Sequence, residues 1–160
     1  MQVLHNFSIP HARNGSIVAP LGSRPLIVQQ NAIAPPLVLM VDDEPAAREM
    51  ARTVLEQSGF RVEEASSGFE AVEKALAHLP DIIVMDLVIP RFSGWEATRK
   101  VKTNPRTQHI PIIALTGDQT LSHHELARAA GCERVLVKPI TAEVLVSEVR
   151  QALARGREHA

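Results

Sequence analysis

From Leu37 onward, short apolar runs alternate with longer segments in which apolar residues recur every three or four positions. The short runs have the length of β-strands, and the longer segments have the period of amphipathic helices. The expected strands are residues 37–41, 62–65, 82–85, 111–115 and 134–137. The expected helices lie near residues 45–58, 67–78, 93–103, 122–130 and 141–155. This alternation is typical of a parallel sheet that is covered by helices on both faces.

Three of the expected strands are continuous apolar sequences, with no alternation of polar and apolar residues. They read LVLMV at 37–41, DIIVM at 81–85 and IPIIAL at 110–115. A strand that is buried on both of its faces requires such a run, because neither face is in contact with water. The pattern therefore predicts an α/β domain built from repeated strand–helix units.

Residues at the ends of the expected helices support the same organisation. Pro45 suits a first helical turn and Thr141 suits an N-cap, while Gly59 and Gly131 fall where the first and fourth helices should end. A serine three residues before a glutamate can form a capping box, in which both side chains bind amides at a helix start. This spacing occurs at Ser67–Glu70, Ser93–Glu96 and Ser122–Glu125.

Residues 1–36 differ in composition from the rest of the chain. They hold five of the eleven prolines, two arginines and no acidic residue, and show no sustained period. We expect a flexible N-terminal tail over 1–36, one domain over 37–155 and a short C-terminal tail over 156–160. An alternative is that the apolar segment 25–28 docks on the domain.

Composition narrows the range of functions. A net charge of −1 gives no basic field for nucleic acid, and four Phe, one Trp and no Tyr offer few surfaces for base stacking. One cysteine, Cys132, rules out a disulfide within the chain and a cysteine-based zinc site, which fits a cytoplasmic protein. No apolar run reaches the roughly 18 residues of a membrane span, and the N-terminus does not read as a signal peptide.

Polar residues that can bind ligands or react follow the expected strands. Asp42 and Asp43 follow the first strand, and Asp86 follows the third. Thr116 and Gly117 follow the fourth strand, and Lys138 follows the fifth. Because the carboxyl ends of parallel strands lie at one edge of a sheet, where ligands bind in open α/β folds, these residues should converge.

The chemistry of such a cluster points to a metal ion and a phosphoryl group. Three aspartates in one place repel each other unless a cation lies among them, and carboxylate oxygens suit Mg²⁺. A compact lysine charge, a Thr116 hydroxyl and the open backbone of Gly117 suit phosphate oxygens. Asp86 beside these groups is a candidate nucleophile for an acyl phosphate. Taken singly, the same residues could be helix caps or turn residues, so the inference rests on their conjunction.

Together these segments resemble the receiver domain of two-component response regulators, of the stand-alone kind seen in chemotaxis regulators. The resemblance covers about residues 36–155, through the motifs LVLMVDDEP, DIIVMDLVIPRFSGWEA, IPIIALTG and GCERVLVKPI. It implies a flavodoxin-like doubly wound (βα)5 fold with strand order 2-1-3-4-5.

The resemblance also implies roles for single residues. Asp86 would be the phosphoacceptor, Asp43 would bind Mg²⁺ directly and Asp42 mostly through water, with the backbone carbonyl of Val88 as a further ligand. Thr116 and Lys138 would hold the phosphoryl oxygens, and the peptide bond before Pro139 would be cis.

Two positions depart from the family pattern. The switch position on the fifth strand, often aromatic, is Val135, so switching would depend on Thr116 alone. The second residue after the acceptor is often polar and can orient an attacking water, whereas here it is Val88.

The resemblance implies a signalling protein rather than an enzyme. A histidine kinase or histidine phosphotransfer protein would donate the phosphoryl group, and output would go to a downstream effector protein or onward in a phosphorelay. The expected output surface comprises 121–130 and 140–145, since no further domain is expected after the fifth helix. We expect no nucleic acid partner, no membrane insertion, and a monomer or weak homodimer. Two alternatives stay open: a haloacid-dehalogenase-like phosphatase, which would want an acid where Val88 stands, and a receiver that is never phosphorylated.

Overall fold

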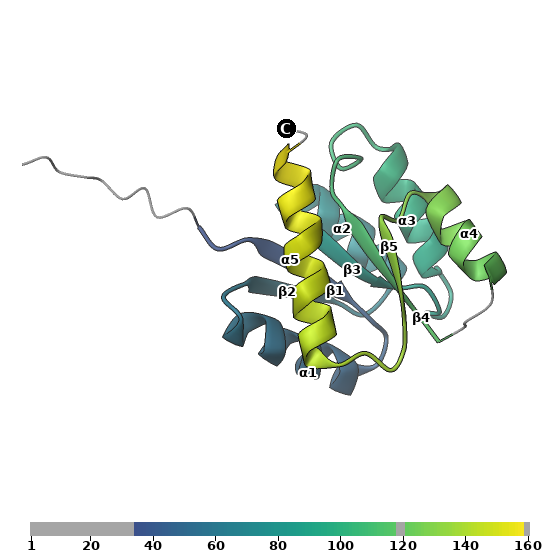
Figure 1. Ribbon diagram of the computed structural model, residues 1–160. Helices are drawn as coiled ribbons and strands as arrows, with labels where there is room; N and C mark the ends of the chain where they lie inside the picture. The colour runs from purple at the N-terminus through teal and green to yellow at the C-terminus, as the bar shows by residue number, and fades with distance from the viewer. Residues whose placement is uncertain (1–33, 118–120, 159–160) are drawn as a thin grey trace, which may run out of the picture. The chain divides into compact units, whose positions relative to one another are not determined.

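The computed structural model describes residues 34–117 and 121–158, and within these the side chains of 121–123 and 157–158 are not described. Five strands form one parallel sheet in the order β2-β1-β3-β4-β5 (Figure 1). The strands are β1 (Leu37–Val41), β2 (Arg61–Ala65), β3 (Ile82–Asp86), β4 (Ile112–Thr116) and β5 (Arg134–Val137). The helices are α1 (Pro45–Gln57), α2 (Gly68–His78), α3 (Gly94–Thr103), α4 (Leu121–Ala130) and α5 (Ala142–Glu158). The flavodoxin-like fold and the strand order are confirmed.

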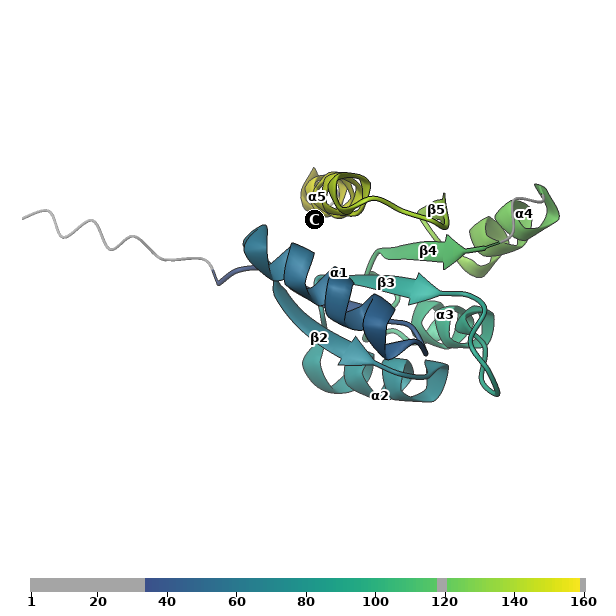
Figure 2. The same ribbon diagram turned by 90° about the horizontal axis from the view of Figure 1, so that it is seen from below.

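Helices cover both faces of the sheet, as the continuous apolar strands require (Figures 1 and 2). Side chains of successive strand residues point to opposite faces, so each central strand contributes to two cores. Leu39 and Val41 belong to the core under α2, α3 and α4, whereas Val38 and Met40 belong to the core under α1 and α5. Strands β1, β3 and β4 are buried at every position, while β2 and β5 lie at the edges of the sheet and are partly exposed.

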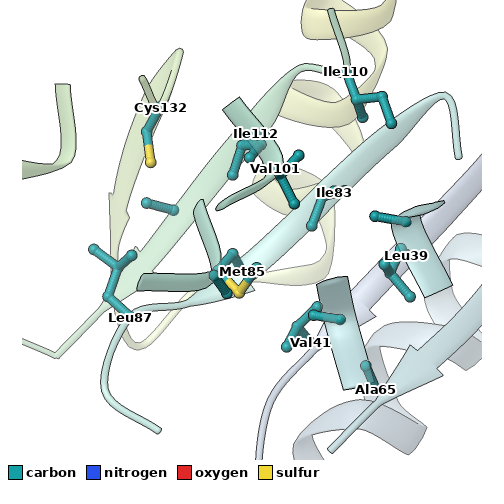
Figure 3. Close-up of a cluster of buried hydrophobic side chains, with 14 of the residues drawn as sticks. Leu39, Val41, Ala65, Ile83, Met85, Leu87, Val101, Ile110, Ile112 and Cys132 are labelled. Atoms are coloured by element: carbon teal, nitrogen blue, oxygen red, sulfur yellow. The ribbon is translucent and has the colours of Figure 1, made fainter. Parts of the chain in front are cut away.

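Figure 3 shows the core on the α2–α3–α4 side, where Met85 and Leu87 lie among aliphatic side chains. Cys132 is buried in the same core. Burial raises the pKa of its thiol to about 11. The thiol is therefore protonated at neutral pH, and we assign this cysteine to packing.

The residues at the helix ends behave largely as expected. Gly59 and Gly131 adopt positive φ angles of 90° and 102° just after α1 and α4, a conformation that costs glycine little. At α3 the full capping box forms between Ser93 and Glu96. At α2 the Ser67 hydroxyl accepts from the Glu70 amide at 3.2 Å.

At α2 the Glu70 carboxylate does not bind the backbone amide of the N-cap residue Ser67, as a full capping box requires. Two groups of Ser66, the backbone N–H at 2.7 Å and the hydroxyl at 2.8 Å, donate to the Glu70 carboxylate, which therefore binds the residue before the N-cap. Lys74 draws the other carboxylate oxygen along the helix at 2.7 Å. The third predicted cap cannot be compared, because the side chain of Ser122 lies outside the described residues.

Helix α5 is longer than expected, and the residues just before β1 accept hydrogen bonds from β2. Helix α5 continues to Glu158 rather than stopping near residue 155, and Ala152 is buried in its last turns, which continues the packing of the helix on the sheet. At the other end, Arg61 donates from its backbone to the Pro36 carbonyl at 2.9 Å and from its side chain to the Pro35 carbonyl at 3.1 Å. Residues 1–33 lie outside the described residues, so the flexible tail stays a prediction.

Candidate functional site

Four strand ends bring the predicted site residues to the carboxyl edge of the sheet. Asp42 follows β1, Asp86 ends β3, Thr116 ends β4, and Lys138 follows β5. Asp42 is 1% exposed, Asp86 5% and Thr116 0%. Polar side chains at such depth need partners, since unpaired burial of a charged group is costly.

Lys138 is the partner that joins the two buried carboxylates. Its ammonium Nζ lies 2.7 Å from Oδ2 of Asp42 and 2.9 Å from Oδ2 of Asp86. The remaining carboxylate oxygens accept backbone N–H groups, from Glu44 to Asp42 Oδ1 and from Val88 to Asp86 Oδ1, each at 2.9 Å. Both carboxylates are therefore held in fixed orientations by one lysine and two amides.

The pKa values of this cluster show the competition between burial and charge. Burial raises the pKa of the Asp86 carboxyl, and the Lys138 and Val88 hydrogen bonds offset this only in part, while the neighbouring Asp42 charge raises it further. For the Lys138 ammonium, burial acts to lower the pKa, but the hydrogen bonds and charges of both aspartates outweigh it, so the pKa is raised. Lys138 is thus protonated, and a further positive charge at the site would stabilise the ionised form of Asp86.

The three predicted metal ligands lie together. One carboxylate oxygen each from Asp42, Asp43 and Asp86 lies within 4.8 Å of the others. Asp43 is exposed, so the cluster opens to solvent on that side. Hard carboxylate oxygens with access to water are the donors that Mg²⁺ prefers, and the residues present therefore fit this ion.

The other predicted residues surround this cluster. The Thr116 carbonyl accepts from the Lys138 amide at 2.8 Å, which ties the fourth and fifth strand ends together. Gly117 is exposed, and a Cβ at this position would meet nothing within 4 Å. The Val88 side chain is 66% exposed. Val135 is half-buried and packs against the core under α3 and α4.

The cis peptide predicted between Lys138 and Pro139 is present. Asp118, which follows Gly117, lies outside the described residues.

Two residues at the site were not singled out from the sequence. Arg48 of α1 donates from Nη1 to the Asp42 carbonyl at 2.7 Å. Gly94, the first residue of α3, passes so close to β3 that a Cβ would lie 2.1 Å from the Asp86 carbonyl oxygen. A glycine at the first position of a capped helix was a signal for close approach, whereas Arg48 reads as an ordinary charged residue of an amphipathic helix.

An open parallel sheet with a buried carboxylate pair, a third carboxylate and a lysine at its carboxyl edge defines a flavodoxin-like protein whose site suits a cation beside an anionic group. Residues 38–150 match the response regulator receiver domain family. The chain belongs to this family. Receiver domains are signalling modules rather than conventional enzymes, and phosphoryl acceptance and dependence on Mg²⁺ are general in them.

Similar proteins agree with this assignment. The polar-differentiation response regulator DivK of Brucella ovis is 34% identical over 116 residues, which cover 72% of this chain and 94% of that protein. The chemotaxis protein CheY4 of Vibrio cholerae superposes with a TM-score of 0.72 at 31% identity, covering 74% of this chain and 99% of that one.

A third similar protein was solved with a metal ion. The receiver domain of the sensor histidine kinase PA1611 of Pseudomonas aeruginosa has magnesium coordinated in its active site cleft. It superposes with a TM-score of 0.70 at 29% identity, covering 76% of this chain and 99% of that one. None of the described helices of the present chain is long and apolar enough to cross a membrane.

Proposed function

We propose that this chain is a phosphorylation-controlled signalling protein that accepts a phosphoryl group on Asp86 from a histidine kinase or a histidine phosphotransfer protein. The observation that carries the proposal is the position of the Lys138 ammonium, which bridges Asp42 and Asp86 at 2.7 and 2.9 Å within a three-carboxylate cluster. Burial of Asp86 is costly, because it raises the pKa of the carboxyl and leaves the charge dependent on Lys138. Perturbed carboxylates of this kind concentrate at functional sites, which supports the proposal.

In the proposed step, Asp86 acts as the nucleophile. A bond forms between one of its carboxylate oxygens and phosphorus, while the phosphorus–nitrogen bond of the donor histidine breaks and the imidazole nitrogen leaves with the electron pair. The Val88 amide, which donates to Oδ1 of Asp86 at 2.9 Å, fixes the rotation of the carboxylate and thereby the direction of attack.

Asp42, Asp43 and Asp86 are the residues that we propose to hold Mg²⁺, with the Val88 carbonyl as a further ligand. A bound Mg²⁺ would neutralise charge on the phosphoryl oxygens. Lys138 then contributes a second positive charge, and Thr116 and the open backbone of Gly117 contribute donors for the same oxygens. Val135 has no aromatic ring and cannot act as an aromatic rotamer switch, so we assign switching to Thr116.

A groove beside the site supplies a surface for the phosphodonor. Its volume is about 450 Å³, and Asp42 and Lys138 contribute to its wall together with apolar residues of α1 and of the segment after β5. Those apolar residues include Ala47, Met50 and Ile140. A helix that carries the phosphohistidine could pack its apolar face here while the phosphoryl group reaches Asp86.

Output is proposed to pass through α4, β5 and α5 to an effector protein, or onward to another phosphotransfer protein. We also propose a cytoplasmic location, since the single cysteine of the chain fits a reducing compartment.

A phosphorylation assay with a small acyl phosphate donor tests the proposal. The protein should take up one phosphoryl group in Mg²⁺ and none in excess chelator, and Asp86→Asn should take up none while remaining folded. Mg²⁺ affinity measured by calorimetry should fall on the order of 10-fold or more in Asp43→Ala.

The alternatives give different results in the same assay. A phosphatase would release inorganic phosphate continuously from phosphate monoesters, and a purely structural receiver would remain unlabelled. Uptake that persists in Asp86→Asn, or an unchanged Mg²⁺ affinity in Asp43→Ala, would refute the proposed site.

A further inference from the structure

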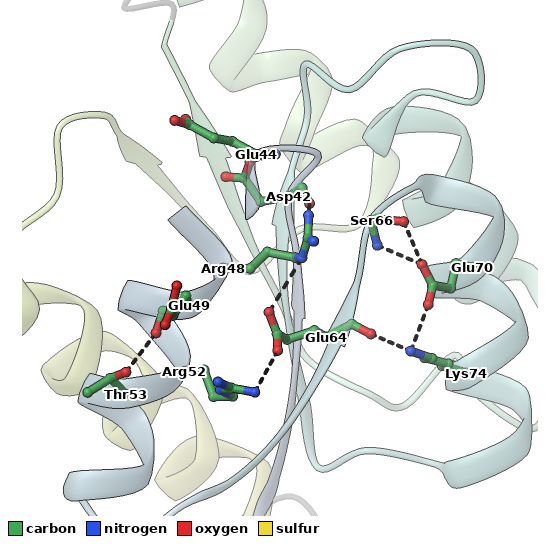
Figure 4. Close-up of polar contacts among 10 residues, drawn as sticks. All are labelled: Asp42, Glu44, Arg48, Glu49, Arg52, Thr53, Glu64, Ser66, Glu70 and Lys74. Carbon is green, nitrogen blue, oxygen red and sulfur yellow. Dashed lines mark hydrogen bonds and ion pairs between the residues drawn. The ribbon is translucent and has the colours of Figure 1, made fainter. Parts of the chain in front are cut away.

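Arg48 connects the acidic site to the edge of the sheet through a chain of contacts that the proposed chemistry does not use. Its guanidinium Nη1 donates to the backbone carbonyl of Asp42 at 2.7 Å, and its Nε lies 3.4 Å from Oε1 of Glu64 on β2 (Figure 4). The Arg48 side chain is only 16% exposed. An arginine held at both ends and withdrawn from water is not a solvated surface charge.

The carbonyl that Arg48 binds stands where the sheet ends. The Asp42 amide still pairs with the Ala65 carbonyl of β2 at 3.2 Å. Beyond Ala65 the chain turns toward α2, and the next amide, of Ser66, donates to the Glu70 carboxylate at 2.7 Å. The Asp42 carbonyl accepts from the Arg48 side chain at this point, where the strand pairing stops. A buried carbonyl at the end of a strand needs such a donor.

The carbonyl of Asp42 and the amide of Asp43 belong to one planar peptide unit. A donor that fixes the direction of this carbonyl therefore fixes the direction in which the chain continues to Asp43. Asp42 is held by Lys138 and by the Glu44 amide, whereas Asp43 is exposed. The orientation of the Asp42–Asp43 peptide consequently decides whether the exposed carboxylate meets the other two.

Glu64 holds Arg48 in the position that this requires. Its two carboxylate oxygens pair with different arginines of α1, Oε1 with Arg48 and Oε2 with Arg52 at 3.1 Å. The Glu64 backbone carbonyl also accepts from Lys74 of α2 (Figure 4). Glu64 is thus held by α1 through its carboxylate and by α2 through its backbone carbonyl, and its carboxylate fixes the Arg48 guanidinium in turn.

We propose that Arg48 is a positioning residue for the metal site, which aligns Asp43 by holding the Asp42–Asp43 peptide. This inference rests on the proposed function, because it concerns the affinity of the same cluster for Mg²⁺.

Electrostatics and positioning predict opposite results for the loss of Arg48. A guanidinium close to a cation site repels the cation, so removing its charge should by Coulomb's law strengthen Mg²⁺ binding. If Arg48 instead aligns a ligand, removing it should weaken binding despite the lost repulsion. The sign of the change therefore separates the two roles.

Calorimetric titration of the full chain with Mg²⁺ is the test, and the variants are Arg48→Met, Arg48→Lys and Arg52→Met. The Kd for Mg²⁺ should rise on the order of 10-fold in Arg48→Met. Arg48→Lys keeps the charge and one donor but not the planar fork, so it should recover part of the affinity. Arg52→Met is the matched control, because it removes a second α1 arginine that also pairs with Glu64. Arg52 makes no hydrogen bond to Asp42 among those observed, so the Kd for Mg²⁺ of this variant should not rise.

A second readout separates positioning from general damage. In Arg48→Met the Mg²⁺ concentration for half-maximal phosphorylation by a small acyl phosphate should rise, while the rate at saturating Mg²⁺ stays within about twofold, because the nucleophile itself is unaltered. Should Arg48→Met not fold, Glu64→Gln weakens the anchor of Arg48 and should raise the Kd in the same direction by less.

An unchanged or lower Kd in folded Arg48→Met, or an unchanged Kd in Glu64→Gln if that variant is needed, would overturn the inference while leaving the metal site intact. Failure of the unsubstituted chain to bind Mg²⁺ would overturn the proposed function together with this inference.

Discussion

Gly94 allows helix α3 to begin directly against the end of β3, the strand that carries the proposed acceptor Asp86. A Cβ at this position would lie 2.1 Å from the Asp86 carbonyl oxygen and 2.7 Å from the Leu87 Cα, and both are backbone atoms that no rotamer change can displace. The capped N-terminus of α3 therefore lies in close contact with the backbone of Asp86, the last residue of β3.

We therefore expect Gly94→Ala to destabilise the domain by about 3 kcal/mol or more, because the helix must separate from the strand. Gly117→Ala is the matched control, since its new Cβ would meet nothing within 4 Å, and its stability should stay within about 0.5 kcal/mol of the unsubstituted protein. Urea unfolding followed by circular dichroism measures both. Equal stability of the two variants would contradict the seating of α3 on β3.

Val88 bears on the lifetime of the phosphorylated state. Its amide orients Asp86, but its side chain is apolar and 66% exposed, so it offers no hydrogen bond to a water that attacks phosphorus. Val88→Asn supplies such a group and should shorten the lifetime several-fold. The decay of labelled protein at fixed Mg²⁺ measures this. Equal decay, or slower decay in the variant, would show that water is positioned by other groups.

Among single residues, the sequence predicted the site residues that directly follow strands. It missed the residues of one helix that contact the backbone of a neighbouring strand. The proximity of Asp42, Asp86 and Lys138 was predictable, because parallel strands place their carboxyl ends at one edge of the sheet. Arg48 could not, because its role depends on the orientation of one carbonyl after the sheet has formed. The consequence of Gly94 likewise depends on the distance between α3 and β3, which no periodicity encodes.

Helix α2 carries a partly exposed carboxylate, that of Glu70, whose pKa is strongly lowered. Hydrogen bonding to the Lys74 side chain, with further bonds from Ser66, lowers the pKa of Glu70 from 4.5 to about 2. A folded-state pKa below the unfolded value means that this group stabilises the protein above the unfolded pKa. That stability is lost as the pH falls from about 4.5 toward about 2, as the unfolded chain takes up the proton first.

Glu70→Gln should therefore flatten the dependence of stability on pH in the acid range. The free energy of unfolding of the unsubstituted protein should fall more steeply between about pH 5 and about pH 3 than that of the variant. Near neutral pH the variant should be less stable by no more than about 1 kcal/mol, since the side chains of the pair are partly exposed, Glu70 by 35% and Lys74 by 32%. Chemical unfolding at a series of pH values measures both slopes, and parallel slopes would contradict the assignment.

Elements were predictable where their signals were local. The box at Ser93 forms as the spacing indicates, whereas at α2 the Glu70 carboxylate turns to Ser66 because Lys74, one helical turn on, competes for it. Helix α5 runs past its expected end near residue 155 to Glu158, through the exposed residues 154–156, which no pattern of burial marks.

The site exists only in the complete fold. Lys138 is 96 residues from Asp42 and 52 from Asp86 in the sequence, and only the order of strands in the sheet brings the three together. In the absence of a metal ion, this lysine is the cation that compensates two carboxylates with exposures of 1% and 5%. Its contribution to stability should therefore depend on whether another cation is supplied.

Lys138→Met leaves two buried carboxylates without their cation. In excess chelator we expect a loss of about 2 to 3 kcal/mol, somewhat less than for a fully buried pair because the lysine side chain is 35% exposed. Saturating Mg²⁺ binds the folded state and replaces part of the missing charge, so the deficit relative to the unsubstituted protein should shrink. Lys100→Met, which removes an exposed lysine of α3, is the control and should show a small and equal effect in both conditions. Urea unfolding of all three proteins in chelator and in Mg²⁺ provides the comparison. A deficit in Lys138→Met that Mg²⁺ leaves unchanged would mean that the lysine and the metal ion do not compensate the same carboxylates.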